Sequence, residues 1–470
     1  MQNYDIKKIF IGPIKSERKS TMNSEKNYKF DIEDTDNLKN IVKFFNEHIF
    51  AEKKKNKIPL IITGSGISMY HIPDMTAIME KIMELLKKYP EENYSDTLKL
   101  LIKNYKDYKN YDNAFDYQSK LLSYIQFAYL KDQRETVEST DVEMLTDVWN
   151  SFIIWLLNGD NGFSEDDLKE YIQKGEKPKK FIGLKKAPST NCHKEIVTMY
   201  KNTNAVSVTT NFDNLLSTAF EEVKHLKEEE KNTNKKVKAP NEEEKDLNIK
   251  FVPILTDEDF EKFFLENPVE GKSKMKQMIE IQSRGDVFWS RCSGENNTIC
   301  PHTKTRCYIP KKDILIDEEN CIRCSICGSP TDVYFAFPAT KEKDTEMAKV
   351  FSMIWKYLAL RCSTIIILGS SMNFDPVLMN FVLELVKRKE IAVLYVSGSN
   401  REKEITERLF CEDVGNRKWV YGSDAAYRVL YKLNHEYEKP ISNNDSVSIR
   451  YNYLDYINFA DSGIGVIHDK

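Results

Sequence analysis

Four short apolar runs recur along the chain, and each ends at a glycine-rich or polar turn. They cover residues 60–62 and 205–208 and begin again at Thr364 and Ile391. Segments with helical spacing of apolar residues accompany them, and "DTDNLKNIVKFFNEHIF" precedes the first run with Asp34 or Thr35 as its N-cap. Apolar runs that alternate with helices indicate a parallel sheet covered on both faces. We therefore predict an α/β fold with a doubly wound, Rossmann-like parallel sheet.

The pattern changes twice along the chain and so predicts inserted units. The stretch 77–180 is rich in Lys, Glu, Tyr and Leu at helical spacing, and 222–250 is a mixed-charge run that suits a solvated helix end and loop. The predicted order is a polar tail (1–34), the start of the Rossmann-like domain (35–76), a helical insertion (77–180), the domain continued (181–280), a cysteine-rich module (281–340), the domain completed (341–435) and a C-terminal tail (436–470). The last segment suits either an extra helix or an interaction surface.

Composition narrows the class of protein. Of 470 residues, 41% are hydrophobic, and 69 basic against 73 acidic residues leave a net charge of −4. This balance argues against nucleic acid as the main ligand. The first twenty residues lack a continuous apolar stretch, and no run reaches the roughly 18 apolar residues of a membrane span. We therefore expect a cytoplasmic protein with no membrane contact.

The turns after the four runs carry the first candidate chemistry. In "GSGIS", Gly64 and Gly66 would let backbone N–H groups approach a phosphate at a helix start. "TTNFD", "GSSMN" and "SGSN" follow the other three runs. Each turn alone is compatible with ordinary turn chemistry. Because ligands of open parallel sheets bind beyond the carboxyl ends of the strands, the four together predict a lined crevice.

Six of the nine cysteines fall between Cys292 and Cys327, and in a large chain expected in the cytoplasm this clustering favours a metal over disulfides. Cys324 and Cys327 form "CSIC", a spacing that lets two thiolates reach one tetrahedral ion. Spacing leaves their partners open, and the candidates are Cys292, Cys300, Cys307, Cys321 and His302. A site with four protein ligands has no open position for water, so we expect structural zinc.

The turn motifs resemble those of the sirtuin family. "GSGISMYHIPDM" is similar to the family's Gly-Ala-Gly-x-Ser fingerprint and its Gly-Ile-Pro-Asp-Phe-Arg continuation, and "PSTNCHKEI" to its Pro-x-x-x-x-His helix start. "TTNFDNLL" resembles the Thr-Gln-Asn-x-Asp segment, and "LGSSMNFDP" the Gly-Thr-Ser-x-x-Val-x-Pro turn. The residues that carry the match are Gly64, Gly66, Ser68, Ile72, Pro73, Asp74, Thr209, Asn211, Asp213, Gly369, Ser371 and Pro376. Order and spacing agree over residues 56–432.

The resemblance implies an NAD-binding Rossmann-like domain with a smaller zinc module. Because sirtuins take their first zinc pair shortly after a His-Gly motif, it favours Cys292 and Cys300 as partners of Cys324 and Cys327. The implied NAD-binding residues are Gly64, Ser65, Gly66, Ser68, Pro73, Asp74, Thr210, Asn211, Gly369, Ser370, Ser371, Ser397 and Asn400.

One substitution bears on the activity. Arg284 stands where the family has its catalytic histidine, and arginine, with a pKa above about 12, cannot act as a general base near neutral pH. Arg284 could instead position a phosphate or carboxylate while NAD loses nicotinamide dissociatively, with Asn211 orienting water or ribose and Asp213 supporting it. Alternatively, the chain binds NAD or an ADP-ribose derivative without turnover, or the alignment is displaced and His193 or His71 reaches the site.

Other departures disfavour a protein deacylase. Met75 and Thr76 replace the family's Phe-Arg, and residues 335–337 read Phe-Ala-Phe in place of Phe-Gly-Glu. With the long helical insertion, these make the chain resemble divergent bacterial sirtuin-like proteins, among which NAD-depleting antiphage effectors occur. We predict an NAD glycohydrolase, with an NAD or ADP-ribose sensor and an NAD-dependent deacylase as alternatives. Since such an activity needs restraint, a second copy of the chain or a regulatory protein is the expected partner.

Overall fold

The structure is a computed structural model of the whole chain. It describes residues 28–50, 58–109, 114–130, 133–174, 176–203, 205–234, 249–254, 276–282, 285–293, 300, 307–308, 315–316, 322–324, 326–335, 362–370, 376–388, 390–400, 408–410 and 415–435. Among these residues, no helix is both long and apolar enough to cross a bilayer.

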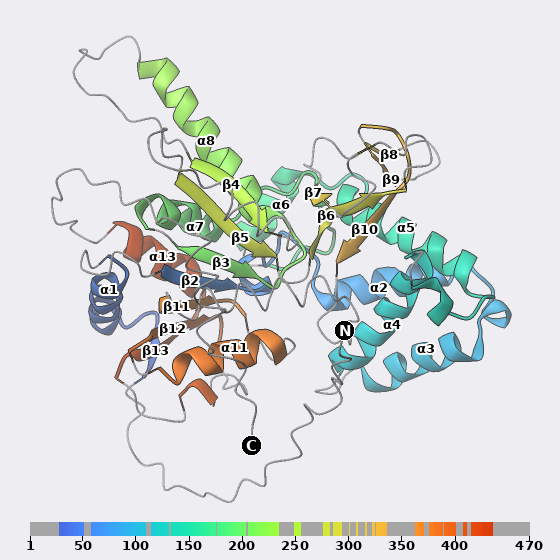
Figure 1. Cartoon of the computed structure of the whole chain (residues 1–470), viewed down its shortest axis with the longest axis horizontal. Coiled ribbons are helices and arrows are strands. Elements are labelled where there is room, and N and C mark those ends of the chain that lie inside the picture. Colours follow the sequence, from blue (N-terminus) through green and yellow to red (C-terminus); the bar gives the residue numbers. More distant parts are fainter. Residues whose placement is uncertain are drawn as a thin grey trace, which may run out of the picture.

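The centre of the fold is an eight-stranded sheet with the order β1-β13-β12-β11-β2-β3-β5-β4, and all its neighbouring strands pair in parallel (Figure 1). From β2 the chain proceeds outward through β3 to the edge formed by β5 and β4, and from β11 it proceeds outward in the other direction through β12 to β13. The strand β1 pairs with β13 and forms that second edge. The topological switch point therefore lies between β2 and β11. The strands are β1 (Lys29–Asp31), β2 (Ile58–Thr63), β3 (Val206–Thr209), β4 (Ile249–Ile254), β5 (Lys276–Gln282), β11 (Cys362–Leu368), β12 (Ala392–Ser397) and β13 (Arg417–Tyr421).

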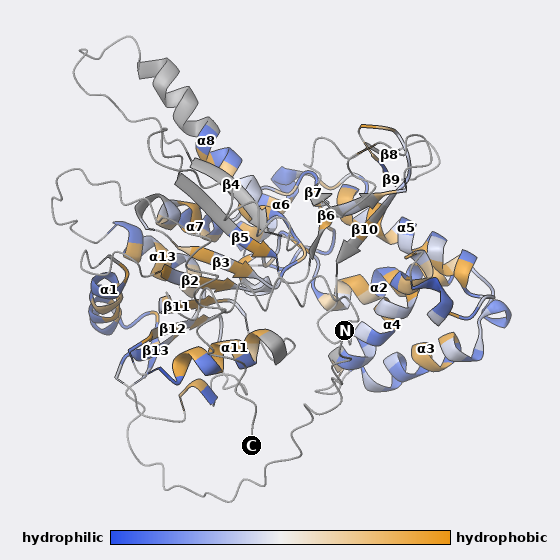
Figure 2. Cartoon of the chain, viewed as in Figure 1, coloured by the Kyte–Doolittle hydropathy of each residue, from blue (hydrophilic) through white to orange (hydrophobic). Residues whose placement is uncertain are grey.

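Helices cover both faces of this sheet because its central strands are apolar on both sides. Leu60 and Ile62 face one buried cluster, which includes α11 (Pro376–Val386), and Ile61 between them faces the other. The second cluster is covered by α1 (Thr35–Phe50), α7 (Asn191–Asn202), α8 (Leu215–Asn234) and α13 (Ala425–His435). Figure 2 shows β2 and β3 as hydrophobic, as buried parallel strands require. The predicted α/β fold is confirmed.

Four strands of the sheet lie outside the four apolar runs. β4 and β5 carry lysines among their apolar residues, as in "KQMIEIQ", and β1 has only three residues. β1 also corrects the expected N-terminal tail, because residues 29–31 pair with β13. Strands near a sheet edge need less apolar surface than central ones, so their patterns are weaker.

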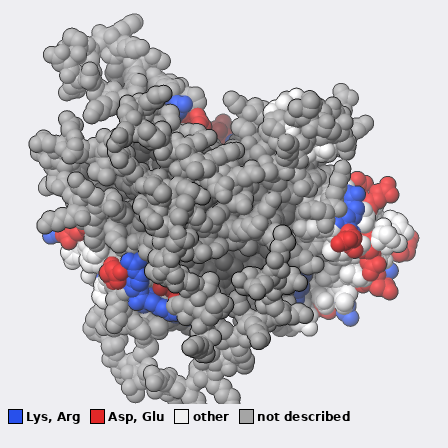
Figure 3. Space-filling model, viewed as in Figure 1, with Lys and Arg blue, Asp and Glu red and all other residues white. Residues whose placement is uncertain are grey.

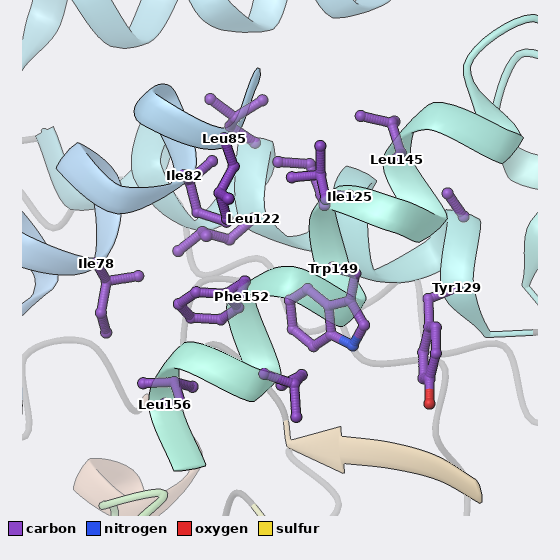
Figure 4. Close-up of a cluster of buried hydrophobic side chains, with 14 of the residues drawn as sticks. Ile78, Ile82, Leu85, Leu122, Ile125, Tyr129, Leu145, Trp149, Phe152 and Leu156 are labelled. Carbon is purple, nitrogen blue, oxygen red and sulfur yellow. The ribbon is translucent and has the colours of Figure 1, made fainter. Parts of the chain in front are cut away.

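The stretch predicted as a helical insertion forms a lobe beside the sheet (Figure 1). Its helices are α2 (Met75–Leu86), α3 (Asp96–Tyr108), α4 (Ala114–Tyr129), α5 (Val142–Asn158) and α6 (Glu165–Lys174), with single 3₁₀ turns at Glu91–Asn93 and Arg134–Thr136. Figure 4 shows the core, in which Trp149 and Phe152 of α5 pack between α2 and α4. Both side chains have 0% exposure, which makes them anchors of the lobe.

A small β-module packs against this helical lobe. It consists of a three-stranded antiparallel sheet in the order β10-β6-β7 and a two-stranded ribbon of β8 and β9. The strands are β6 (Gly285–Cys292), β7 (Cys307–Tyr308), β8 (Leu315–Ile316), β9 (Ile322–Arg323) and β10 (Thr331–Phe335). Val287, Phe288 and Val333 belong to the same buried cluster as α4 and α5, so lobe and module share one core.

The described surface of the helical lobe is mixed in charge. Figure 3 shows lysine and arginine side chains next to acidic ones over this lobe, at the right of the view. An example is the pair Lys81–Glu84 on α2, with 3.1 Å between Nζ and Oε2. Exposed pairs of this kind contribute little stability, and they leave both signs of charge on this face.

Candidate functional site

The two turns at the switch point are in direct backbone contact. The N–H of Gly64 donates to Leu368 O at 3.1 Å, and the N–H of Gly66 donates to Gly369 O at 2.9 Å. A Cβ on Gly66 would stand 2.8 Å from the Cα of Gly369, whose own φ is +59°. Glycine is therefore required on both sides of this contact. Ligands of parallel sheets bind at the carboxyl ends of the strands, and here the turns after β2 and β11 pack closely against each other at that edge.

A buried polar network lies directly behind the first turn. The Ser68 hydroxyl donates to Asp213 Oδ2 at 3.0 Å and accepts from Asn211 Nδ2 at 3.0 Å. The second carboxylate oxygen of Asp213 accepts from the N–H of Leu215 at 3.0 Å, where α8 begins. Ser68, Asn211 and Asp213 are 0%, 5% and 4% exposed, so the hydrogen bond to Ser68 orients the Asn211 amide in a buried setting.

His193 on α7 lies beside this network. Its Nε2 lies 3.4 Å from Ser68 Oγ, and its Nδ1 lies 2.6 Å from Oγ1 of Thr190. The Thr190 hydroxyl donates to Ile67 O at 3.0 Å and so accepts from Nδ1 of His193. In this tautomer Nε2 carries no proton, and because Ser68 gives its own proton to Asp213, the 3.4 Å approach of Nε2 to Ser68 is a contact and not a hydrogen bond. Burial, aided by His71, lowers the pKa of His193 to about 3, so the ring is neutral at neutral pH.

His71 has a similar environment. Its Nδ1 lies 2.8 Å from the carbonyl oxygen of Pro188, which must accept the proton. Burial lowers the pKa of His71 as well. The sequence offers His71 and His193 as alternatives to the family base, and the structure places His193 beside the network with 2% exposure. Its partner Thr190 was not singled out, although the Thr-x-x-His spacing at a helix start is a recognisable N-cap signal.

The remaining predicted NAD-binding residues are arranged along the same edge. Ser65 and Gly66 are exposed on the first turn, and Thr210 donates through N–H and hydroxyl to Thr63 O at 3.1 and 3.2 Å. Ser370 is buried beside Gly64, and Pro73 is buried at the end of the motif. Ser371 and Arg284 lie outside the described residues.

Three further predicted NAD-binding residues already have structural partners. Asp74 is exposed and caps α2, since its Oδ1 accepts from the N–H of Ala77 at 2.9 Å, and it also pairs with Lys177. After β12, Ser397 accepts from Trp419 Nε1 at 2.8 Å, and Lys29 donates to the carbonyl oxygen of Asn400 at 2.8 Å. The contacts of Ser397 and Asn400 hold the segment that follows β12 at the carboxyl edge of the sheet.

The four cysteines favoured as ligands come together in the β-module. The sulfur atoms of Cys292, Cys300, Cys324 and Cys327 all lie within 4.8 Å of one another. The Sγ atoms of Cys292 and Cys327 are 3.3 Å apart, and those of Cys300 and Cys324 are 3.8 Å apart. Four thiolates around one tetrahedral zinc ion, each at about 2.3 Å, would stand about 3.8 Å from one another. The donor set therefore fits structural zinc. Cys321 and His302 lie outside the described residues, and the described cluster does not include Cys307.

The "CSIC" turn has the backbone that this cluster needs. The N–H of Gly328 donates to Cys324 O at 2.8 Å, and Gly328 has a φ of +70°. The N–H of Cys324 in turn donates to Ser329 O at 2.9 Å. Through its hydroxyl and backbone amide, Ser329 lowers the pKa of Cys327 to about 6, which favours the thiolate that a metal requires.

The β-module also contacts the network at the sheet edge. The N–H of Val287 on β6 donates to the carbonyl oxygen of Phe212 at 3.2 Å, and Phe212 lies between Asn211 and Asp213. The Phe212 side chain packs against the core of the helical lobe. The turn that carries the two predicted catalytic residues is therefore held by sheet, module and lobe together.

This combination defines an α/β protein with a polar switch-point site and a four-cysteine module. Among solved structures, the chain is similar to Sir2Tm bound to a propionylated peptide, with a TM-score of 0.38, 12% identity, and 85% of this chain and 98% of that chain covered. It is also similar to Sir2 with a p53 peptide and NAD⁺ (TM-score 0.36, 12% identity, 85% and 98% covered). A third similar structure is a Sir2 homologue in complex with ADP-ribose (TM-score 0.36, 13% identity, 85% and 98% covered). No family model and no curated protein matches the chain.

Proposed function

We propose that the chain binds NAD along the carboxyl edge of the sheet and cleaves its nicotinamide glycosidic bond with water. The observation that carries the proposal is the fixed amide of Asn211. Its Nδ2 donates to Ser68, whose hydroxyl is itself held by Asp213, and the three residues adjoin the glycine turn at the switch point. An amide oriented in this way is suited to hold a water molecule or a ribose hydroxyl.

Cleavage of the nicotinamide glycosidic bond depends more on the orientation of the ribose and water than on a general base. When the bond between C1′ of the ribose and the nicotinamide nitrogen breaks, the bonding pair leaves with nicotinamide and a positive charge develops on the ribose. The oxygen of water then bonds to C1′, and one water proton passes to solvent, which gives ADP-ribose and nicotinamide. Asn211 would orient the water through its Oδ1, and Asp213 would act through Ser68 as a positioning residue. This route suits a chain with Arg284 in place of the family's histidine.

We further propose structural zinc in the four-cysteine cluster. The residues that would hold it are Cys292, Cys300, Cys324 and Cys327, and the support is their mutual sulfur distances. Bound zinc would stabilise the β-module, in which the strands β7, β8 and β9 have only two residues each. The module would in turn hold β6 against the carbonyl group of Phe212.

The test is nicotinamide release from NAD by the purified full-length chain with no second substrate. We expect the unmodified chain to release nicotinamide and Asn211→Ala to be slower by about 100-fold or more. Thr97→Ala, which removes a hydroxyl bonded to Glu138 in the helical lobe, is the control and should match the unmodified chain.

The other outcomes assign the alternatives. Thermal stabilisation by NAD without nicotinamide release would identify a sensor and overturn the hydrolase. Release only in the presence of an acylated peptide would identify a deacylase. Release by Arg284→His alone would show that the natural chain is a silenced enzyme.

A further inference from the structure

A side chain on α4 forms hydrogen bonds between the helical lobe and the β-module. The hydroxyl of Tyr129 donates to Thr331 O and accepts from the N–H of Val333 at 3.4 Å. β10 is an edge strand of its sheet, and these two backbone groups lie two residues apart, on the side away from β6. One buried hydroxyl therefore satisfies both groups on the outer edge of β10.

The ring of Tyr129 belongs to the core of the lobe. Tyr129 is 9% exposed, and its ring centroid lies 6.4 Å from that of Trp149. Figure 4 shows the ring beside Trp149, with the hydroxyl oxygen pointing away from the packed side chains. The ring therefore fixes where the hydroxyl stands, because Trp149 has 0% exposure and packs against Phe152.

From β10 the connection continues to the predicted catalytic turn. Thr331 is opposite Cys292 in the ladder between β10 and β6, and Val333 is opposite Ser290. The pairing then becomes irregular, and within this stretch the N–H of Val287 donates to Phe212 O. A shift of β10 would therefore move β6 and, through one backbone hydrogen bond, the turn that holds Asn211 and Asp213.

We propose that Tyr129 is a positioning residue for the Asn211–Asp213 turn and acts through β10 and β6. The expected effect on NAD cleavage rests on the proposed function. The connection from Tyr129 through β10 and β6 to Phe212 does not depend on it. Tyr129 does not touch the turn itself. Its hydroxyl sets the position of the strand pair that bonds to Phe212.

The same helix offers a matched control. Tyr124 is also 9% exposed, and its hydroxyl also donates and accepts, to Asp141 Oδ2 at 3.2 Å and from the N–H of Glu138 at 3.1 Å. Both of these partners lie within the helical lobe. Tyr124→Phe therefore removes a comparable hydroxyl without loosening β10.

The experiment compares Tyr129→Phe and Tyr124→Phe in the full-length chain. Hydrogen exchange is measured on peptides that cover residues 205–215 and 285–292, together with zinc content and the kcat and KM of NAD cleavage. We expect Tyr129→Phe to raise exchange in both peptides about fivefold, which corresponds to one hydrogen bond, with zinc content unchanged. We expect its kcat to fall about tenfold and its KM to stay within about twofold. Tyr124→Phe should change neither peptide nor kcat.

The experiment distinguishes failure of the positioning role of Tyr129 from failure of the proposed NAD cleavage. Unchanged exchange at residues 205–215 in Tyr129→Phe would overturn the positioning inference, and so would an equal effect of Tyr124→Phe. If the unmodified chain does not cleave NAD, the proposed function fails, and the exchange data still decide whether Tyr129 controls the turn. Because phenylalanine keeps the buried ring at each of the two positions, we expect both variants to fold.

Discussion

The polar network at the sheet edge is buried, as are three residues of the four-cysteine cluster, in which Cys327 is partly exposed. The two groups are completed in different ways. In the network, Ser68, Asn211 and Asp213 satisfy one another through hydrogen bonds of 3.0 Å, so the arrangement needs only protein groups. In the cluster, four sulfur atoms approach within 4.8 Å, and thiols are weak hydrogen-bonding groups. The first group holds its geometry through hydrogen bonds between protein groups, whereas the second has the donor set of a metal site.

This difference determines how each region should fail. A buried polar network loses stability in steps, since each broken hydrogen bond costs about 1–3 kcal/mol when its partner stays buried. A four-ligand metal site fails as a whole, because a structural zinc ion contributes folding free energy of about 10 kcal/mol or more. Substitutions in the two regions should therefore give effects of clearly different size.

The largest effect is expected for Cys324→Ala. Cys324 is 0% exposed, and its loss removes one of four thiolates, so we expect the chain to lose its zinc and its β-module to unfold. NAD cleavage should fall by more than about 100-fold, because β6 would no longer hold the carbonyl group of Phe212. Metal analysis and hydrogen exchange over residues 285–335 measure the effect. Cys362→Ala, at a buried cysteine in β11, is the control and should keep its zinc.

Gly66→Ala should give the next largest change. The added Cβ would meet the backbone of Gly369 at 2.8 Å, and because the nearest atoms belong to the backbone, no side-chain rotation can relieve the contact. Overpacking of this kind costs about 1–3 kcal/mol, and separation of the two turns should also weaken NAD binding. Chemical denaturation measures the change in the free energy of unfolding, and titration with NAD measures the change in affinity. Gly398→Ala, where a Cβ would meet no atom within 4 Å, is the matched control. An unaltered free energy of unfolding in Gly66→Ala would contradict the close approach.

Ser68→Ala probes the network alone. Removal of the hydroxyl leaves Asn211 Nδ2 and Asp213 Oδ2 without this partner, which should lower the free energy of unfolding by about 1–3 kcal/mol. The kcat for NAD cleavage should fall by about tenfold or more, because the Asn211 amide is no longer fixed, and zinc content should stay at the level of the unmodified chain. A fall in zinc content would mean that network and cluster are not separate units.

The pH dependence of stability should come in part from the buried histidines. His193 has a folded pKa of about 3 against 6.5 for an exposed imidazole, so below pH 6.5 the unfolded chain binds the proton and the folded chain does not. The free energy of unfolding should therefore fall as the pH is lowered from 6.5 towards 3, by up to about 1.4 kcal/mol per pH unit for this group. Burial lowers the pKa of His71 as well, which adds a slope of the same sign.

Denaturation between pH 6.5 and 5 measures this slope before most carboxylates titrate. His193→Gln should be less stable than the unmodified chain and should show a shallower slope. An equal slope in His193→Gln would mean that His193 is protonated in the folded chain.

The smallest effect is expected for Asp74→Asn. Asparagine also caps helices, and the pair with Lys177 is exposed, so the free energy of unfolding should change by only a few tenths of a kcal/mol. Because Asp74 already accepts from the N–H of Ala77, we expect the KM for NAD to change by less than about threefold. A larger rise in KM would assign Asp74 a direct contact with the nucleotide, as the sirtuin resemblance implies.

Much of the framework was predictable from local patterns. The buried strands β2, β3, β11 and β12 follow continuous apolar runs, and α1 begins where the Asp34 cap suggested. The strands β1, β4, β5 and β13 were not predicted, because polar residues interrupt them and their partners come from distant parts of the chain. The choice of Cys292 and Cys300 likewise came from family resemblance, since spacing alone left other candidates open.

The sequence by itself determined which residues could do chemistry: the glycine turns, the Asn-x-Asp segment and the closely spaced cysteines. Residue type and short-range spacing suffice there, because glycine conformations, capping and thiolate chemistry are local properties. Only the tertiary structure decided that Ser68 orients Asn211, that Thr190 sets the tautomer of His193, and that Tyr129 connects the helical lobe to the predicted catalytic turn. These contacts join residues from different elements, and the packing of sheet, lobe and module brings them within hydrogen-bonding distance.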